Sequence, residues 1–525
     1  MRISNPFMRA HYSDTPRGCV DNFPVRYVLA TLCLLLTFPA DPLLAAERRD
    51  IGLTQKGAAL EAFIVEGESE RVATVVLVGG LDGTGASSRA VQAEITRYEA
   101  SLETRRPFRL VAIPLANPER NRLQFPPAGV AYRENAESHV LWRWIGIHAP
   151  DLVVVAGEDF GLAQALSQNA VAGIGRIPAT RMDPAPGLLN AVPPVIAVSQ
   201  AHAEIDRRQG RSPRQLAEEL AQVYGHDFDQ LTYLPGMALI GQLRLGNTEE
   251  VVRLAERYLD GRDNLARASS LTLAGHLVFA ELAERTSDPR YTALVRKAAD
   301  TGFTESGAMK ESMPYHDEMS DSVFMAILLL AKAGKLTGDR KYFDMAARHL
   351  AFMQKLVLRP DGLYRHSPLT DAAWGRGNAF PALGLALAMS DFPMDHPAYE
   401  EMVSAFVSHM TELAPLQNED GLWRQVVDRP GSYAEFSSTA MIATAMLRGI
   451  RNGWLDSRTF QPIVEKAWHA VLARAGSDGV LFDVCESTNK QRSVDDYLRR
   501  AAILDRDPRG GGMALIFATE MAGLK

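Results

Sequence analysis

Asp361-Gly-Leu-Tyr364 recurs along the chain as Asp420-Gly-Leu-Trp423 and as Asp478-Gly-Val-Leu481, at spacings of 59 and 58 residues. Pairs of segments with helical periodicity lie between the copies. A repeat of this length indicates a structural unit of two helices and one loop. The second helix of successive pairs is expected to open with an aromatic residue, at Tyr291, Tyr342, Tyr399 and Phe460.

Twelve segments after Pro213 have the periodicity of helices, and no segment there has the pattern of a strand. They lie near residues 213–225, 231–244, 247–260, 270–285, 289–301, 321–336, 340–356, 376–390, 397–412, 437–453, 459–473 and 510–522. Six hairpins with a recurrent loop predict an all-α six-hairpin (α/α)6 toroid over residues 213–525. Function is expected on the face where the long loops converge. Those loops are residues 302–320, 357–375, 413–436 and 474–509.

The first part of the chain has a different pattern. Short β-like runs at 73–78, 108–113 and 152–155 alternate with amphipathic stretches. This alternation predicts an α/β layered domain over residues 47–175. Residues 176–212 are rich in proline and are expected to form a linker. The chain is therefore predicted to be multidomain.

Composition narrows the class of protein. The 525 residues are 46% hydrophobic and 23% charged, which is typical of a globular protein. A net charge of −7 gives no overall attraction to nucleic acid, so no nucleic-acid partner is expected. Cys19 and Cys33 lie in the leader, which leaves Cys485 for a mature chain. A disulfide scaffold, a cysteine zinc cluster and an iron–sulfur site are thereby excluded, and no metal or cofactor is expected.

The leader has the features of a secretory signal. An apolar run at 27–38 follows three arginines and precedes Ala45-Ala46. The run is shorter than the roughly 20 residues that span a bilayer. We therefore predict a signal peptide over residues 1–46, cleaved near Ala46, and export to the periplasm or the medium. The alternative is an uncleaved anchor. No stable membrane insertion is expected after cleavage.

The long loops bring together acids, aromatic side chains and planar donors. Asp321 directly precedes a predicted helix, so it is either a helix N-cap or a functional acid. His366 could donate a proton or orient a neighbour. Arg376 and Arg424 could clamp a carboxylate, and aromatic rings such as Trp423 could stack on sugar faces.

The order of these motifs resembles the unsaturated glucuronyl and rhamnogalacturonyl hydrolases of glycoside hydrolase families 88 and 105, whose fold is a six-hairpin α/α barrel. The resemblance covers roughly residues 245–525. Its most specific element is Trp374-Gly-Arg-Gly-Asn378. The other elements are Met319-Ser-Asp-Ser-Val-Phe-Met325, Tyr364-Arg-His366, Gly421-Leu-Trp-Arg-Gln425 and Ser437-Ser-Thr-Ala-Met441.

The resemblance implies a reaction and a site. Asp321 matches the acid that protonates C4 of a 4,5-unsaturated uronic acid while water adds at C5. Phe380 stands where the family usually has tryptophan. The candidate substrate-binding residues are His316, His366, Trp374, Arg376, Asn378, Phe380, Trp423 and Arg424. The expected partner is an oligosaccharide that contains uronic acid.

One departure from the family pattern concerns a second aspartate about one helix pair upstream. Residues 266–275 contain no acid. Asp263, Glu311 or Glu318 could substitute, and spacing does not choose among them.

The N-terminal region weakly resembles zinc carboxypeptidases of the carboxypeptidase A type. The residues concerned are Val76-Leu-Val-Gly-Gly-Leu-Asp-Gly83, Ile113-Pro-Leu-Ala-Asn-Pro-Glu-Arg120 and 150–155. Asp82 replaces the first ligand histidine, Gly85 falls at the ligand glutamate, and Gly157-Glu-Asp159 stands at the second histidine. We therefore expect a degenerate scaffold without metal, serving carbohydrate binding or packing. A carboxylate site built on Asp82 and Asp159 is the alternative.

The leading hypothesis is an exported glycoside hydrolase that acts on unsaturated uronyl ends, with Asp321 as the proton donor. The first alternative is a hydrolase of saturated uronides, which requires a carboxylate across the cleft from Asp321. The second is a non-catalytic glycan-binding protein, which requires Asp321 to be only a cap. A peptidase would need a metal that this sequence does not provide for.

Overall fold

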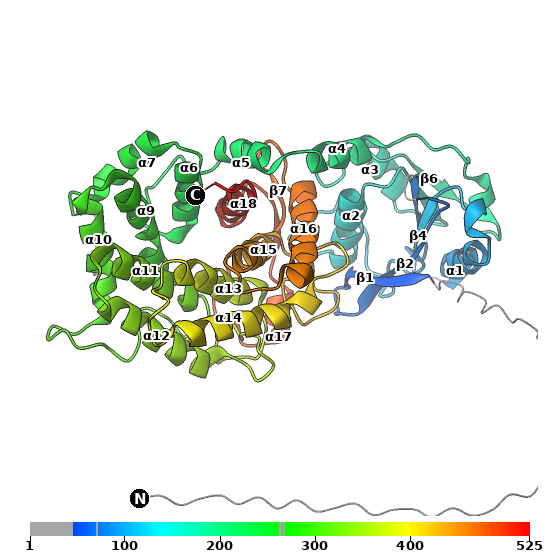
Figure 1. The fold of residues 1–525 in the computed structure, drawn as a ribbon. Coiled ribbons are helices and arrows are strands. Elements are labelled where there is room, and N and C mark those ends of the chain that lie inside the picture. Colours follow the sequence, from blue (N-terminus) through cyan, green and yellow to red (C-terminus); the bar gives the residue numbers. More distant parts are fainter. Residues whose placement is uncertain (1–45, 70–71, 84, 262–264, 266–267, 525) are drawn as a thin grey trace, which may run out of the picture. The chain divides into compact units, whose positions relative to one another are not determined.

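The computed structural model describes residues 46–524 except 70–71, 84, 262–264 and 266–267 (Figure 1). The predicted signal peptide, up to residue 45, lies outside the described residues. Within the described part of the chain, no helix combines the length and the apolar character that crossing a bilayer requires.

Six strands form one sheet in the first part of the described chain. They are β1 (Glu47–Leu53), β2 (Ala59–Val65), β3 (Thr74–Val78), β4 (Arg109–Ile113), β5 (Leu152–Ala156) and β6 (Ala179–Met182), in the order β1-β2-β4-β3-β5-β6. β3 to β6 pair in parallel, whereas β1 and β2 add antiparallel strands at one edge. The three strands predicted from the sequence are β3, β4 and β5, and their presence is confirmed.

Helices cover both faces of this sheet, which is the predicted α/β layering. They are α1 (Gly85–Glu99), α2 (Ala136–His148) and α3 (Leu162–Gln168). Leu77 packs with Val91 of α1 on one face, whereas its neighbour Val76 packs with Leu141 of α2 on the other. The central strands are therefore apolar on both faces, as covered parallel strands are. The likeness to zinc carboxypeptidases stays a prediction.

The range expected to be a linker contains regular structure. β6 lies in it and completes the sheet, and α4 (Gln200–Gln209) follows. The strand was not evident because β6 is only four residues long and none of them is fully buried. Ser199 caps α4 by accepting a hydrogen bond from the His202 N–H at 3.0 Å.

Helices dominate the chain from Pro213 onward, at the positions predicted. Residues 270–285, predicted as one helix, form two that meet at His276. The helices are α5 (Pro213–Ala221), α6 (Tyr233–Arg244), α7 (Thr248–Ala255), α8 (Ser270–Gly275), α9 (Leu277–Thr286), α10 (Pro289–Ala299), α11 (Ser322–Thr337), α12 (Lys341–Val357), α13 (Gly375–Met389), α14 (Tyr399–Leu413), α15 (Phe436–Arg451), α16 (Ser457–Arg474) and α18 (Pro508–Met521).

The helices close into a double ring. Along the inner ring, α6 contacts α8 and α9, which contact α11, and α13, α15 and α18 follow in turn. α18 packs back against α6 and closes the ring (Figure 1). The outer ring consists of α5, α7, α10, α12, α14 and α16. This arrangement is the predicted (α/α)6 toroid.

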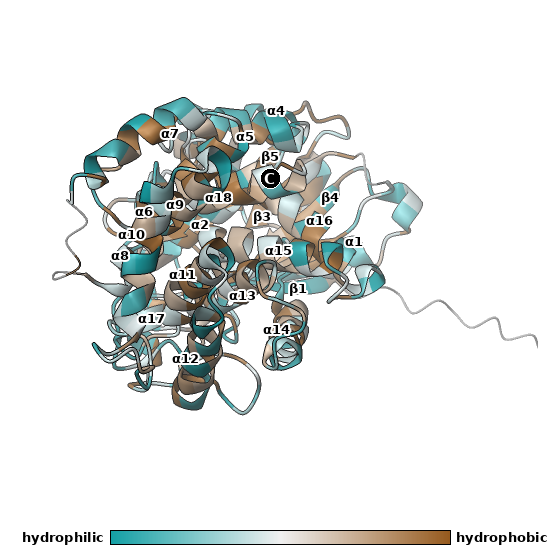
Figure 2. Cartoon of the chain, turned by 60° about the vertical axis from the view of Figure 1, so that its left-hand side comes forward, coloured by the Kyte–Doolittle hydropathy of each residue, from teal (hydrophilic) through white to brown (hydrophobic). Residues whose placement is uncertain are grey.

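Burial separates the two rings. Every residue of α13, from Gly375 to Met389, is buried, as expected of a helix surrounded by other helices. α12 and α7 carry hydrophobic and hydrophilic residues on different sides (Figure 2). The aromatic residues predicted to open the outer helices are all buried, namely Tyr291, Tyr342, Tyr399 and Phe460.

The expectation that no strand follows Pro213 is wrong. β7 (Leu481–Cys485) and β8 (Ala502–Asp505) form an antiparallel pair, with the short helix α17 (Val494–Leu498) between them. Asp483 interrupts the apolar run of β7 and has a positive φ of 61°, so the run lacks strand alternation. Residues 481–505 are called the bridging segment below.

The sheet and the toroid share a core. Phe482 of the bridging segment and Ala473 of α16 belong to the apolar cluster on the α2 face of the sheet. Arg208 of α4 donates to the carbonyl of Ala473 at 3.0 Å, and Arg211 donates to the carbonyls of Leu472 and Ala475. The described chain therefore forms one compact unit.

Candidate active site

The long loops precede the inner helices, so they gather where those helices begin. Asp321 stands directly before α11, and Trp374 stands directly before α13. His366 comes from the loop between α12 and α13, and Tyr497 comes from α17 in the bridging segment. Four separate parts of the chain therefore meet at one place.

Asp321 does not cap its helix. Its backbone is helical, at φ −52° and ψ −31°, and its side chain makes no capping hydrogen bond. Oδ1 lies 3.4 Å from Nε2 of His366, and the side chain is 16% exposed. The Asp321 carboxylate is therefore free of a capping role and is available to contact the His366 imidazole and to transfer a proton.

Other buried acids in this region serve as caps. Glu435 precedes α15 and accepts hydrogen bonds from the N–H groups of Ser437 and Ser438. Asp507 precedes α18 and accepts from the N–H groups of Arg509 and Gly510. The carboxylates of Glu435 and Asp507 therefore accept hydrogen bonds from the first N–H groups of their helices, whereas the carboxylate of Asp321 does not.

His366 is fixed from its other side by Tyr497. The Tyr497 hydroxyl lies 2.7 Å from Nδ1 of His366 and also accepts from the Gln491 N–H at 3.3 Å. Burial raises the pKa of Tyr497 to about 12, so the hydroxyl stays neutral. A hydroxyl that donates to Nδ1 leaves the imidazole proton on Nε2, which faces Asp321.

Trp374 and Arg376 pack beside His366. The ring centroids of His366 and Trp374 are 4.4 Å apart, and the Arg376 guanidinium lies 4.7 Å from the Trp374 ring. Arg376 donates to the carbonyl of Cys485 at 2.6 Å and to the carbonyl of Glu486 at 2.8 Å. The predicted carboxylate clamp is therefore also a link from α13 to the bridging segment.

Buried polar atoms without a partner gather at this place. Among the described residues, no hydrogen bond satisfies the Ser320 Oγ, the Asp321 Oδ1 or the His366 Nε2. The same holds for the Trp374 Nε1 and the Arg376 Nε. Because proteins rarely bury unpaired polar atoms, such a cluster indicates a site for a polar ligand or for ordered water.

Packing explains both glycines of the Trp-Gly-Arg-Gly-Asn element. A Cβ atom on Gly375 would lie 2.8 Å from the carbonyl oxygen of Arg424. A Cβ atom on Gly377 would lie 3.0 Å from Oγ of Ser320 and 3.2 Å from the Trp374 ring. The start of α13 thus packs closely against the Arg424 backbone at Gly375 and against the Asp321 loop at Gly377.

Three predicted contact residues have their roles inside the protein. The Asn378 side chain donates to the carbonyls of Tyr364 and Trp374 and accepts from the Tyr364 N–H. Trp423 is fully buried, and its indole N–H donates to a backbone carbonyl at 2.7 Å. Phe380 is buried among the aromatic side chains of the inner helices.

The two remaining predicted residues lie elsewhere. Arg424 lines a cavity of about 60 Å³ together with Tyr132 and Arg143, so it faces the sheet. His316 lies half-buried on the Asp321 loop and accepts from the Glu318 N–H at 2.9 Å. Burial lowers the pKa of His316. It lines an open cavity of about 410 Å³ on the long-loop face.

No acid begins α8, where the family pattern has its second aspartate. Ser269 and Thr272 form a capping box there. Of the three substitutes considered, Asp263 lies outside the described residues. Glu311 is exposed, and Glu318 is exposed and pairs with Lys490 at 3.5 Å. Neither of them forms a hydrogen bond with Oδ1 of Asp321, which has no hydrogen-bond partner among the described residues.

The sequence predicts a sheet domain without metal, with a carboxylate site built on Asp82 and Asp159 as the alternative. In the described part of the chain, no three or more His, Cys, Asp or Glu side chains come together as a metal site. Asp159 accepts hydrogen bonds from the N–H groups of Gly161 and Ala163 at the start of α3. Asp82 lies 3.5 Å from the Ser87 hydroxyl.

Tyr497 was missed by sequence reasoning. The only local signal is Ser493-Val-Asp-Asp496, in which Ser493 caps the turn that carries Tyr497. The sheet reaches the same segment through Asp483, which accepts from the Tyr132 hydroxyl at 2.9 Å and pairs with Arg143. Cys485, which binds Arg376, follows two residues later.

Comparison with known proteins agrees with this architecture. The sequence model of the protein family described as Glycosyl Hydrolase Family 88 matches residues 207–525 of this chain. The unsaturated rhamnogalacturonyl hydrolase YesR of Bacillus subtilis (strain 168) is 26% identical over 214 residues, covering 39% of this chain and 60% of that protein. An unsaturated 3S-rhamnoglycuronyl hydrolase of Formosa agariphila is 36% identical over 111 residues, covering 20% of this chain and 29% of that protein. The chain thus spans less than two thirds of either relative.

Among solved structures, a possible member of the GH105 family from Klebsiella pneumoniae subsp. pneumoniae MGH 78578 superposes with a TM-score of 0.52. It is 21% identical, and the match covers 59% of this chain and 93% of that chain. At this identity the likeness concerns the fold, and it supports the toroid. The family match covers more than half of the chain, so this protein belongs to glycosyl hydrolase family 88.

Proposed function

We propose that this protein is an exported hydrolase that removes 4,5-unsaturated uronic acid from the non-reducing end of lyase-generated oligosaccharides. The observation that carries the proposal is the state of Asp321. It is a largely buried acid at the start of an inner helix, it does not cap that helix, and it faces His366 at 3.4 Å. The names of the two curated relatives, both unsaturated uronyl hydrolases, support the same type of reaction.

In the proposed reaction, Asp321 gives its proton to C4 of the vinyl ether and positive charge develops at C5. Water adds at C5 and returns a proton to Asp321. The resulting hemiketal opens, and the bond to the neighbouring sugar breaks as that sugar leaves with a proton. A single positioned acid is sufficient, since protonation falls on carbon and not on the leaving oxygen.

The neighbours of Asp321 have distinct proposed roles. His366, with its proton on Nε2, would hold the carboxylate and contact the sugar. The indole N–H of Trp374 and the Nε–H of Arg376 are donors without partners among the described residues, so they suit the carboxylate of the sugar. Tyr497 would position His366 without touching the substrate.

The alternatives are less well supported. A hydrolase of saturated uronides usually needs a second carboxylate across the cleft. The buried acids that directly precede the inner helices α15 and α18, Glu435 and Asp507, both cap those helices. A purely glycan-binding protein would not need a buried acid without a structural bond.

The test is loss of the ultraviolet absorbance of the conjugated uronate when purified protein is mixed with lyase digests of pectin, glycosaminoglycan and ulvan. We expect the absorbance to fall with at least one digest, and that digest identifies the glycan class. If a folded protein left the absorbance of every digest unchanged, the proposal would be refuted.

Two finer proposals concern the first part of the chain. Export with cleavage near Ala46 is supported by the sequence pattern alone, and N-terminal sequencing of protein recovered from the periplasm or medium tests it. A carboxypeptidase-like sheet without metal is supported by the hydrogen bonds that the Asp159 carboxylate accepts from the Gly161 and Ala163 N–H groups. Stoichiometric zinc in the purified protein would contradict it.

A further inference from the structure

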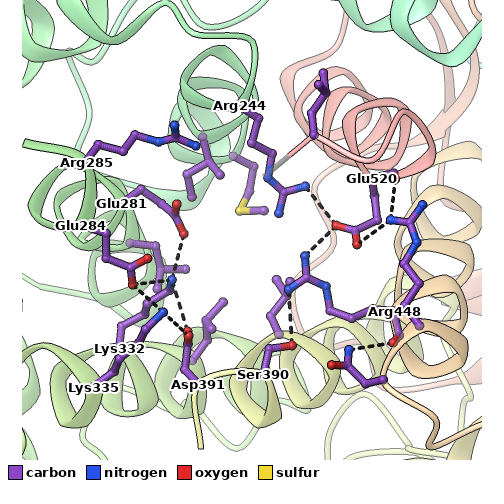
Figure 3. A pocket seen from close by; sticks show the side chains of 18 of the residues that line it. Arg244, Glu281, Glu284, Arg285, Lys332, Lys335, Ser390, Asp391, Arg448 and Glu520 are labelled. Carbon is purple, nitrogen blue, oxygen red and sulfur yellow. Dashed lines mark hydrogen bonds and ion pairs between the residues drawn. The ribbon is translucent and has the colours of Figure 1, made fainter.

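A cavity of about 870 Å³ lies at the ends of the inner helices remote from Asp321 (Figure 3). Side chains of α6, α9, α11, α13, α15 and α18 line it. α11 begins just after Asp321 and reaches the cavity at Lys332 and Lys335, so roughly 20 Å of helix separates the two places. The volume lies in the range of small-molecule sites.

One wall of the cavity has an excess of positive charge. Glu520 pairs with Arg448 at 2.6 Å and with Arg244 and Arg451, each at 3.2 Å. Three guanidinium groups therefore share one carboxylate. The C-terminal ends of α6, α15 and α18 each carry roughly half a negative charge, which offsets most of this excess but leaves the wall positive.

The guanidinium of Arg448 is the group best placed for a ligand. It lies between Ser390 and Glu520 (Figure 3), at 3.4 Å from the Ser390 hydroxyl. Its Nε is buried and has no hydrogen-bond partner among the described residues. An arginine whose Nε–H has no hydrogen-bond partner, on a positively charged wall, is suited to bind the carboxylate of a ligand.

The opposite wall carries three carboxylates, two lysines and Arg285. Lys332 pairs with Glu281 at 2.9 Å and with Asp391 at 3.2 Å. Lys335 pairs with Asp391 at 2.6 Å and with Glu284 at 3.2 Å. Three carboxylates thus surround two ammonium groups, and their remaining lone pairs can accept hydrogen bonds from hydroxyl groups.

The floor between the two walls is apolar. Leucine, isoleucine and methionine side chains of α6, α9, α11 and α13 form it, among them Met237, Ile240, Leu277 and Leu328. In Figure 3 the Glu281–Lys332–Asp391 group and the Arg244–Glu520–Arg448 group face each other across open space. Such a floor can pack against the C–H face of a ring.

We propose that this cavity binds a sugar acid, either free or as the end of a short acidic oligosaccharide. The carboxylate would pair with Arg448, the hydroxyl groups would donate to Glu281, Glu284 and Asp391, and the ring would lie on the floor. The site is separate from Asp321, and its occupancy does not depend on turnover or on the proposed function.

The first experiment is calorimetric titration of the full protein with sodium glucuronate, with glucose as the neutral control. We expect saturable binding of glucuronate, weakened at least about tenfold by Arg448→Gln. Arg458→Gln, which removes an exposed arginine of α16, is the matched control and should bind like the wild type. Equal binding by Arg448→Gln and the wild type, or equal binding of glucose, would overturn the proposal.

A second measurement separates this cavity from the active site. Ser390 is exposed at the cavity, so Ser390→Cys places an accessible thiol there, whereas Cys485 is buried. Glucuronate should slow maleimide labelling of that thiol several-fold, and trigalacturonate should do so as well if the end of a chain is bound. No protection by either ligand, or equal protection by inorganic phosphate, would refute a sugar-acid site. If Arg448→Gln does not fold, Arg451→Gln replaces it with the same expectation.

Discussion

The hydroxyl of Tyr497 lies 2.7 Å from Nδ1 of His366, although 131 residues separate the two in sequence. Because Tyr497 also receives the Gln491 N–H, its own proton is available for His366. The other imidazole nitrogen then faces Asp321 at 3.4 Å. Asp321, His366 and Tyr497 form a linked chain that the bridging segment completes.

Replacing Asp321 with Asn should abolish turnover of unsaturated oligosaccharides and leave folding intact. An amide cannot deliver the proton that the proposed reaction requires, and Asp321 makes no cap whose loss would destabilise α11. The assay follows absorbance loss, with thermal melting as the folding check. The control is Asp317→Asn, an exposed acid of the same loop, which should retain activity. Near-wild-type activity in Asp321→Asn would rule out the mechanism.

Replacing Tyr497 with Phe should lower kcat by about 10- to 100-fold, with a smaller effect on KM. The ring packing stays, but His366 loses the bond that fixes its orientation and tautomer. The pH dependence of kcat should also shift, which a merely structural residue would not cause. An unchanged kcat and pH profile would remove Tyr497 from the site.

Replacing Gly377 with Ala should reduce activity more than stability. Alanine usually stabilises a helix by up to about 1 kcal/mol relative to glycine, but here the new methyl would press on Ser320 and Trp374. Gly210→Ala is the matched control. Gly210 ends α4 with a helical φ of −72°, and its nearest neighbours would lie at 3.5 Å or beyond. Full activity in Gly377→Ala would contradict the packing argument.

Replacing Arg143 with Met should destabilise the protein by about 3–5 kcal/mol, because Asp483 would keep a buried charge without its partner. Adding Asp483→Asn should restore part of the loss, since asparagine tolerates the positive φ of 61° and carries no charge. Urea unfolding measures both changes, and Arg89→Met, at an exposed position of α1, is the control. A double variant less stable than the single one would contradict this account.

Acid should remove the stabilisation that Glu204 gains from Arg207 and Arg208 on α4. Hydrogen bonds from Arg207 and Arg208 lower the pKa of Glu204 to about 2. A carboxyl whose pKa is lower in the folded state stabilises the fold above its unfolded pKa of about 4.5, and this contribution disappears as the pH falls towards 2. Partial exposure limits it to about 1 kcal/mol.

The measurement compares urea unfolding of the wild type and Glu204→Gln at pH 7 and pH 3.5. The difference in unfolding free energy should be smaller at pH 3.5. Glu305→Gln, an exposed control, should show no such trend. A difference that grows on acidification would reverse the predicted sign.

Much of the toroid was predictable because its signals are local. Helical periodicity and turn chemistry are short-range properties, and the helices begin and end close to the predicted positions. The Asp-Gly repeat has an equally local cause. Gly362, Gly421 and Gly479 all have a positive φ, between 78° and 89°, which glycine adopts without strain.

The bridging segment was not predictable in the same way. β7 and β8 are short, they pair across an intervening helix, and Asp483 breaks their pattern. The strands form because α15, α18 and the sheet supply partners for them. Tyr497 reaches His366 only after that assembly is complete.

The sequence by itself determined the toroid and the central strands of the sheet, because hydrophobic periodicity depends only on neighbouring residues. It also determined the cluster of Asp321, His366, Trp374 and Arg376, because the order of short motifs can be seen directly in the chain. Only the tertiary structure decided which acids became caps, that Asn378 and Trp423 serve the interior, and that Tyr497 completes the site. Tyr497 and His366 are 131 residues apart, so only closure of the ring brings them together. The caps and the Asn378 and Trp423 contacts are short-range, but their burial depends on the helices packed around them.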